Sequence, residues 1–167
     1  MDSVDWYLVN TKTHREKTAE MNLQQLGVEV FCPLLQQEKI IRRKRQHVVA
    51  PLFPGYLFAK FDPNHQYRAV HYATGISKVV MFGATPAKVE EELIEALKAK
   101  MLNGIMRVAM QSAFKPGQKV RIQDGPFRGL EAVFECEMSD HQRVALLLQA
   151  VAYQARVVLR TEQVSSI

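Results

Sequence analysis

Residues 50–61, which read APLFPGYLFAKF, constrain the fold more than any other part of the chain. Pro51 and Pro54 bracket a turn, and from Gly55 onward the side chains alternate as they do along a β-strand. The alternation predicts two apolar faces, one with Tyr56, Phe58 and Lys60 and the other with Leu57, Ala59 and Phe61. Two interpretations stay open for this stretch: a central strand buried by helices on both sides, or a strand whose aromatic face binds a partner.

The composition is that of a globular protein with a basic charge balance. Of the 167 residues, 47% are hydrophobic and 23% are charged, and 22 Lys and Arg against 17 Asp and Glu give a net charge of +5. This charge favours an anionic partner. Nucleic acid is favoured over a membrane, because no apolar run approaches the ~20 residues that span a bilayer. The start, MDSVDWYLV, lacks the basic and apolar regions of a signal peptide, so we expect a cytoplasmic protein.

Metal, disulfide and catalytic chemistry find no support in the residue pattern. Cys32 and Cys136 lie far apart with no CxxC spacing, so we expect two free thiols, with Cys32 buried. The five histidines are scattered, and there is no Gly-rich phosphate loop, Ser/His/Asp set or supported carboxylate pair. We therefore predict a protein that is not an enzyme and that uses no cofactor.

Local signals in the first hundred residues predict an α+β domain. Strands are expected at 6–9, 28–35, 56–61 and 76–82. One helix should begin at a capping box formed by Thr13 and Glu16 and end at Gly27, and a second should begin at Thr85 and Pro86. The buried side of that second helix is expected to carry Val89, Leu93, Ile94, Leu97 and Met101. Residues 65–75 suit either a short helix or a loop. This order predicts an antiparallel sheet with helices packed on it.

Basic side chains gather in two stretches of this domain. Four consecutive cations between β-branched flanks predict a hairpin or loop that projects into solvent. Together with cations near the first helix they form a candidate nucleic-acid patch, which comprises Lys12, Arg15, Lys17, Arg42, Arg43, Lys44 and Arg45. The alternative is an ordinary solvated charged face.

The last third of the chain supports two folds. Residues 103–113 lack a clear pattern and are predicted to be a linker. In residues 114–167, turns around Gly117, Gly125 and Gly129 predict a small antiparallel barrel. Residues 141–160, however, contain no Gly or Pro, and their apolar side chains recur with a helical period, at Val144, Leu147, Leu148, Val151, Ala155, Val158 and Leu159. A similar stripe at Phe127, Leu130, Phe134 and Met138 makes a helical hairpin available as well.

Two motifs together resemble a known family over nearly the whole chain. The first is PLFPGYLF at residues 51–58, and the second is the KOW pattern with glycines at 117, 125 and 129. The chain resembles the NusG family of transcription elongation factors, and within it the specialised RfaH-like branch. The resemblance implies a polymerase-binding NusG N-terminal-like domain at 1–102, a linker at 103–113 and a KOW domain at 114–167. That second domain would be a β-barrel that can switch to an α-helical hairpin.

The resemblance also implies roles for individual residues. In the family, aromatic residues at the positions of Tyr56 and Phe58 form a hydrophobic depression that receives the paired clamp helices of the largest subunit of RNA polymerase. The resemblance implies the same role for Tyr56 and Phe58 here, with Leu52 and Phe53 beside them. Lys12 and Arg42 match basic positions on the side of the domain that faces the non-template DNA strand. The residues expected to hold the second domain against the first, or to bind its partner, are Phe127, Leu130, Phe134, Arg143, Leu147 and Leu148.

The chain departs from the RfaH-like pattern in three places. Ala50 stands where the interdomain ion pair of that branch has its acid, although Arg143 matches the basic partner. Thr74 replaces an arginine, and residues 66–68 replace a His-Thr-Thr run that touches the other large polymerase subunit. The chain is therefore not expected to read the same DNA element through the same side chains.

Three functions remain open from the sequence. The first is a bacterial, operon-specific antiterminator that acts as a monomer and recruits a small-subunit ribosomal protein through the KOW domain. The second is a general NusG-type elongation factor. The third is a ribosome-associated, RNA-binding KOW protein, which would have no need of the PLFPGYLF motif.

Overall fold

The chain folds around an antiparallel sheet with the strand order β2-β5-β1-β6, in a computed structural model that describes residues 4–107 and 139–165. The strands are β1 (Asp5–Thr11), β2 (Glu29–Phe31), β5 (Tyr56–Phe61) and β6 (Ile76–Val79), and β9 (Lys88–Val89) also pairs with β1. In the register of the two central strands, Leu8 lies opposite Phe58. This sheet confirms the predicted α+β class with an antiparallel core.

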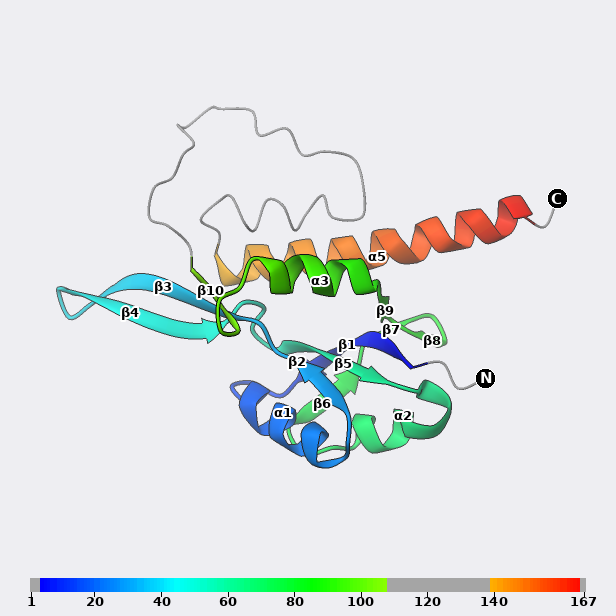
Figure 1. Cartoon of the computed structure of the whole chain (residues 1–167), viewed down its shortest axis with the longest axis horizontal. Coiled ribbons are helices and arrows are strands. Elements are labelled where there is room, and N and C mark those ends of the chain that lie inside the picture. The colour runs from blue at the N-terminus through cyan, green and yellow to red at the C-terminus, as the bar shows by residue number, and fades with distance from the viewer. Residues whose placement is uncertain (1–3, 108–138, 166–167) are drawn as a thin grey trace.

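Helices cover both faces of the sheet (Figure 1). On one face lie α1 (Glu16–Gln25) and α2 (Pro63–His71), and on the other lie α3 (Glu91–Ala99) and α5 (Asp140–Ser165). The alternation predicted for residues 56–61 is confirmed, because Phe58 belongs to the apolar cluster under α3 and α5. Leu57, Ala59 and Phe61 belong to the other cluster, under α1 and α2. The strand is thus central and buried on both sides.

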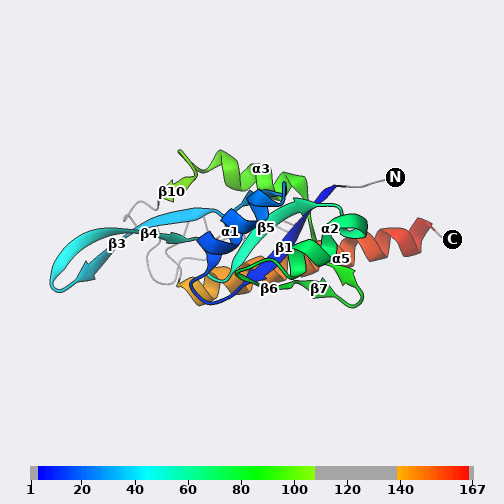
Figure 2. The same cartoon turned by 90° about the horizontal axis from the view of Figure 1, so that it is seen from below.

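A long hairpin projects from this body (Figures 1 and 2). It comprises β3 (Leu34–Ile41) and β4 (Lys44–Pro51), with Arg42 and Arg43 as its turn. Of the two alternatives predicted at the four cations, a hairpin or a loop, the structure has the hairpin. Both turn residues have positive φ, 53° and 66°, which is the pattern of a type I′ turn. The strand β10 (Ile105–Arg107), within the segment predicted to be a linker, pairs in parallel with the base of β3.

The helix start predicted at Thr13 is wrong. The helix begins at Glu16, its cap residue is Arg15, and no side chain caps it. The Glu16 carboxylate instead accepts a hydrogen bond of 2.9 Å from the backbone N–H of Gly55. A contact across 39 positions of sequence has replaced the local one, and the chain turns at His14, which has a φ of 58°. The predicted end at Gly27 is confirmed, and its φ is 79°.

The helix start predicted at Thr85 and Pro86 is also wrong. These two residues form β8 (Thr85–Pro86), which pairs with β7 (Met81–Phe82) across a turn at Gly83. Val89 is buried as expected, but it lies in β9, and the helix starts only at Glu91. Backbone pairing with neighbouring strands has overridden the helix-start signal. The segment that suited a helix or a loop contains α2, capped by the side chain of Asp62, which accepts from Asn64 N.

The helical alternative for residues 141–160 is confirmed by α5. Its start has a signal that the sequence analysis missed, a capping box in which Ser139 and Gln142 exchange hydrogen bonds. The KOW pattern, Cys136 and the stripe with Phe127, Leu130 and Phe134 lie outside the described residues. Cys32 is partly buried rather than fully buried.

Candidate functional site

The aromatic face of β5 forms one side of a continuous apolar cluster. Phe58 is fully buried, and its ring lies 5.9 Å from that of Phe31 and 6.2 Å from that of Phe53. The cluster also contains Trp6 and Leu8 from β1, and α3 supplies Leu93, Ile94 and Leu97. The face predicted to bind a partner is therefore preorganised by packing from two strands and one helix.

The helix α5 covers this face. Leu147 and Val151 are fully buried in the same cluster as Phe58, and Val144 and Leu148 pack at its edge. Of the predicted docking residues, Leu52, Phe53 and Phe58 are buried, and Tyr56 is half-buried. In this conformation the face predicted to bind a partner and the helical segment predicted to lie over it are brought together.

A buried arginine fixes the start of α5 to the first domain. Arg143 is 3% exposed, and its Nε donates a hydrogen bond of 2.8 Å to the carbonyl oxygen of Leu52. Its guanidinium also pairs with Asp140, one turn earlier on the same helix. Ala50 cannot supply an acid to Arg143. Arg143 bonds instead to a backbone carbonyl and to an acid of its own helix.

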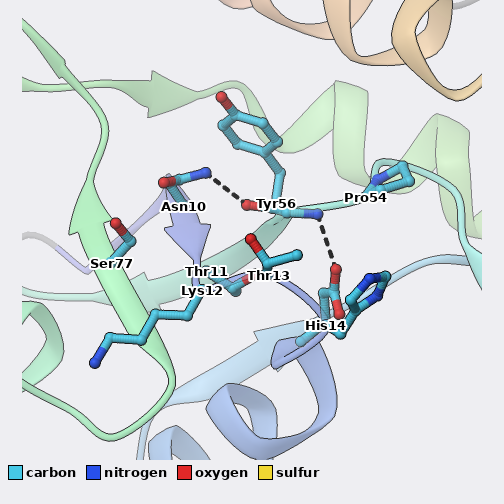
Figure 3. A pocket seen from close by; sticks show the side chains of 10 residues that line it. Asn10, Thr11, Lys12, Thr13, His14, Pro54, Tyr56 and Ser77 are labelled. Carbon is cyan, nitrogen blue, oxygen red and sulfur yellow. Dashed lines mark hydrogen bonds between the residues drawn. The ribbon is translucent and has the colours of Figure 1, made fainter.

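A cavity of about 510 Å³ opens beside the turn before β5 (Figure 3). Asn10 donates to the carbonyl of Gly55 at 2.8 Å, which holds the turn against β1. Lys12 and Ser77 lie on one side of the cavity and His14 on the other. Thr11 is 4% exposed, and within the described residues its hydroxyl has no hydrogen-bond partner. The carboxylate of Glu16 lines the cavity as well as Lys12, so the cavity can accept a polar group.

The predicted basic patch is divided in two. Lys12, Arg15 and Lys17 are exposed near the start of α1, and Lys12 also lines this cavity. The other four cations, Arg42, Arg43, Lys44 and Arg45, are exposed at the tip of the β3–β4 hairpin, which points away from α1 (Figures 1 and 2). The ladder has eight residue pairs, so its tip lies seven steps from its base, a reach of roughly 23 Å at about 3.3 Å per residue. The seven cations therefore do not form one continuous patch.

Comparison with known proteins decides the family. A family model described as "Transcription termination factor nusG" matches residues 4–98, more than half of the chain. The chain belongs to the NusG family. It is 31% identical over 143 residues to the transcription termination/antitermination protein NusG of Thermus thermophilus, covering 75% of this chain and 78% of that protein.

Further NusG proteins are more distant. The NusG of Escherichia coli is 26% identical over 125 residues, which cover 72% of this chain and 68% of that protein. The NusG of Streptomyces griseus is 25% identical, with 96% of this chain and 63% of that protein covered. A solved structure of Thermotoga maritima NusG is similar with a TM-score of 0.39 and 21% identity, covering 57% of this chain and 55% of that chain.

Membership of the NusG family supports the prediction that the chain is not an enzyme, because these relatives are named as transcription factors.

Within residues 4–107 and 139–165, no helix is long and apolar enough to cross a membrane. Burial raises the pKa of the Cys32 thiol to about 12, helped by Glu20 and Glu16, so this thiol is held protonated at neutral pH.

Two features of this NusG-family site were not found from the sequence. The first is the pair of contacts that Asn10 and Glu16 make with Gly55, because their partners are distant backbone atoms. The second is the contact from Arg143 to Leu52, which spans 91 positions. For α5 itself a local signal existed, the Ser139 and Gln142 capping box.

Proposed function

We propose that this chain is an RfaH-like transcription antitermination factor, which binds the clamp helices of RNA polymerase through the aromatic face of β5. The predicted anchors are Leu52, Phe53, Tyr56 and Phe58. The observation that carries the proposal is that α5 buries Leu147 and Val151 in the Phe58 cluster. An apolar face of packed aromatic side chains suits partner binding, and a single helix over it could leave to expose that face when the partner is bound.

Covering the docking face makes the factor conditional. A ligand that binds only the open state has its apparent affinity reduced by the open fraction, so a face open in ~1% of molecules binds ~100-fold more weakly. Such a protein acts only where a further signal helps to open it. This supports operon-specific action, in which the bound factor suppresses pausing and termination without chemistry of its own.

The α1 patch, defined as Lys12, Arg15 and Lys17, is proposed to hold the non-template DNA strand in the polymerase complex. Its support is the exposure of the three cations near the start of α1, where Lys12 also lines the cavity. Phosphate contacts release counterions, so single-strand binding should weaken with salt by a slope of roughly 0.7 per neutralised phosphate. Replacing Arg15 and Lys17 with Gln should reduce that slope.

Once released, the C-terminal domain is proposed to refold as a KOW barrel that recruits a small-subunit ribosomal protein. The support is that the same segment carries both barrel turn chemistry, at Gly117, Gly125 and Gly129, and the helical period realised in α5. Two packings of one sequence can interconvert where they differ by a few kcal/mol.

The test is the binding of the full chain to RNA polymerase elongation complexes. Leu147→Asp with Val151→Asp should release α5 and raise the affinity, because burying two carboxylates in the Phe58 cluster is costly. Adding Tyr56→Ala should then abolish most of that binding. Tyr56 is the better probe because it is half-buried, whereas truncating the fully buried Phe58 would damage the core.

The second candidate is a general NusG-type elongation factor, which the names of the relatives favour. In that case the docking face is available without a releasing signal. Equal affinity of the natural chain and the Leu147→Asp, Val151→Asp variant would support this candidate. Binding that survives Tyr56→Ala in the released variant would contradict the assignment of the face.

A further inference from the structure

We propose that the tip of the β3–β4 hairpin is a separate nucleic-acid contact that inserts into the major groove of duplex DNA. The tip is defined as Ile40 to Arg45. This contact is additional to the proposed single-strand contact of the α1 patch. It rests on the proposed function only in that the nucleic acid is taken to be DNA. The observations that carry it are the charge distribution, the turn conformation and the shape of the ribbon.

The cations occupy every side of the tip. In the register, Ile40 pairs with Arg45 and Ile41 pairs with Lys44. Cross-strand partners share a face and successive residues alternate, so Arg45 and Lys44 lie on opposite faces of the ribbon. A flat anionic surface would meet only one of them. Two charged faces suit a slot with a phosphate backbone on either side.

The turn is occupied by residues that its conformation disfavours. Arg42 and Arg43 both have positive φ, a conformation that Asn-Gly adopts most readily. Placing two arginines there costs free energy, and their side chains are exposed to solvent rather than packed. Strain of this kind is retained where a side chain serves a function. The cost is explained if the arginines meet phosphates or guanine edges at the leading end of the ribbon.

The surroundings of the tip agree with a polyanionic partner. The hairpin strands contain one acidic residue, Glu38, and its register partner is His47 rather than a residue of the tip. Ile40 is 76% exposed, and Ile41 is 39% exposed, which is unusual for large apolar residues within a strand pair. In a groove such side chains contact sugars and thymine methyl groups.

The shape of the ribbon selects the kind of duplex. The strand β10 covers only Leu34 to Gln36 of β3, so the outer half of the hairpin has two strands. Five residue pairs extend beyond that point, a length of roughly 17 Å at about 3.3 Å per residue. The major groove of B-form DNA, about 12 Å wide and about 8.5 Å deep, admits such a ribbon. The major groove of A-form RNA is too narrow.

The test uses the full chain and a fluorescein-labelled 20-base-pair DNA duplex, with binding followed by fluorescence anisotropy. The variant Arg42→Asn, Arg43→Gly removes two cations and installs the residues that a type I′ turn prefers, so the hairpin stays folded. Its thermal melting temperature should equal or exceed that of the natural chain. We expect a loss of affinity of about tenfold or more, and a salt slope smaller by about 1.8, or about 0.9 for each phosphate that the variant no longer neutralises.

The matched control is Arg15→Gln with Lys17→Gln, which removes the same charge from the α1 patch. It should change duplex affinity by less than about twofold and should reduce binding of a single-stranded oligonucleotide instead. Duplex binding that weakens equally in both variants, or stays unchanged in the hairpin variant, overturns the hairpin contact. The choice of B-form DNA is overturned if the full chain, through the hairpin, binds a 20-base-pair RNA duplex or the single strand as tightly as the DNA duplex, or more tightly. If the control variant leaves single-strand binding intact while the hairpin variant no longer binds the duplex, the α1 proposal fails and the hairpin contact stands.

Discussion

The two faces of the central sheet are both buried, but they are covered by different parts of the chain. Beneath α1 and α2, the covering helices belong to the same hundred residues as the strands they pack on, and they join them through short connections. The other face is covered in part by α3, from the same hundred residues, and in part by α5, which begins far beyond β5 in the sequence and brings a buried cation, Arg143, with it. The first face is the core of the fold. The second is a core completed by α5, the helix proposed above to be a removable cover.

The largest effect is expected from truncating a side chain beneath α1 and α2. Phe61 is fully buried there, and Phe61→Ala should lower the free energy of unfolding of the whole domain by about 3–5 kcal/mol. Urea denaturation followed by Trp6 fluorescence would measure it. A loss below about 1 kcal/mol would show that this face is not the permanent core.

The second test concerns the cover itself. Leu147→Ala should weaken the docking of α5 by about 2–3 kcal/mol while preserving the helix, because alanine favours helix formation. Hydrogen exchange should become faster in α5 and stay slow in β5. The exposed Gln149 offers a control on the same helix, since Gln149→Ala should change neither rate. Equal acceleration in β5 would mean that the two faces unfold as one unit.

Much of this division could be predicted from residues close together in sequence. Alternation at residues 56–61 assigned the two faces correctly. The apolar period from Val144 to Val151 predicted the helix as one of two folds for that segment, and the cations at 42–45 predicted a hairpin or a loop. In each case a local pattern reduced the possible structures to one or two.

The two errors in helix starts have different causes. Glu16 left its predicted capping role for the distant backbone N–H of Gly55, whereas Thr85 joined a short local strand pair across the turn at Gly83. The bond from Arg143 to Leu52 could not be predicted, because a carbonyl oxygen carries no sequence signature. The separation of the hairpin cations from the α1 patch depends on strand length, which sequence reasoning fixes poorly.

A third test addresses the role of the buried cation. Arg143→Met keeps the length of the side chain but removes its bond to Leu52 and its pairing with Asp140. Since charged hydrogen bonds contribute about 1.5–3 kcal/mol, the docking of α5 should weaken by that order. Hydrogen exchange of the first turns of α5 would report it. Arg143→Lys should lose less, because an ammonium can still donate to one carbonyl.

The smallest expected effect tests how tightly β2 closes the core beneath α1 and α2. Cys32 packs against that core, and burial raises the pKa of its thiol from about 9 in the unfolded chain to about 12. A raised pKa in the folded state means that the stabilising contribution is complete below pH 9 and declines as the pH rises toward 12, because only the unfolded chain releases its proton in that window. The difference in unfolding free energy between the natural chain and Cys32→Ala should therefore fall by about 1 kcal/mol from pH 9 to pH 10. Urea titrations at the two pH values measure it, and titration of the remaining groups cancels in the difference. An unchanged difference would mean that this thiol is solvated, and that the permanent core is less closed at β2 than the packing of Cys32 implies.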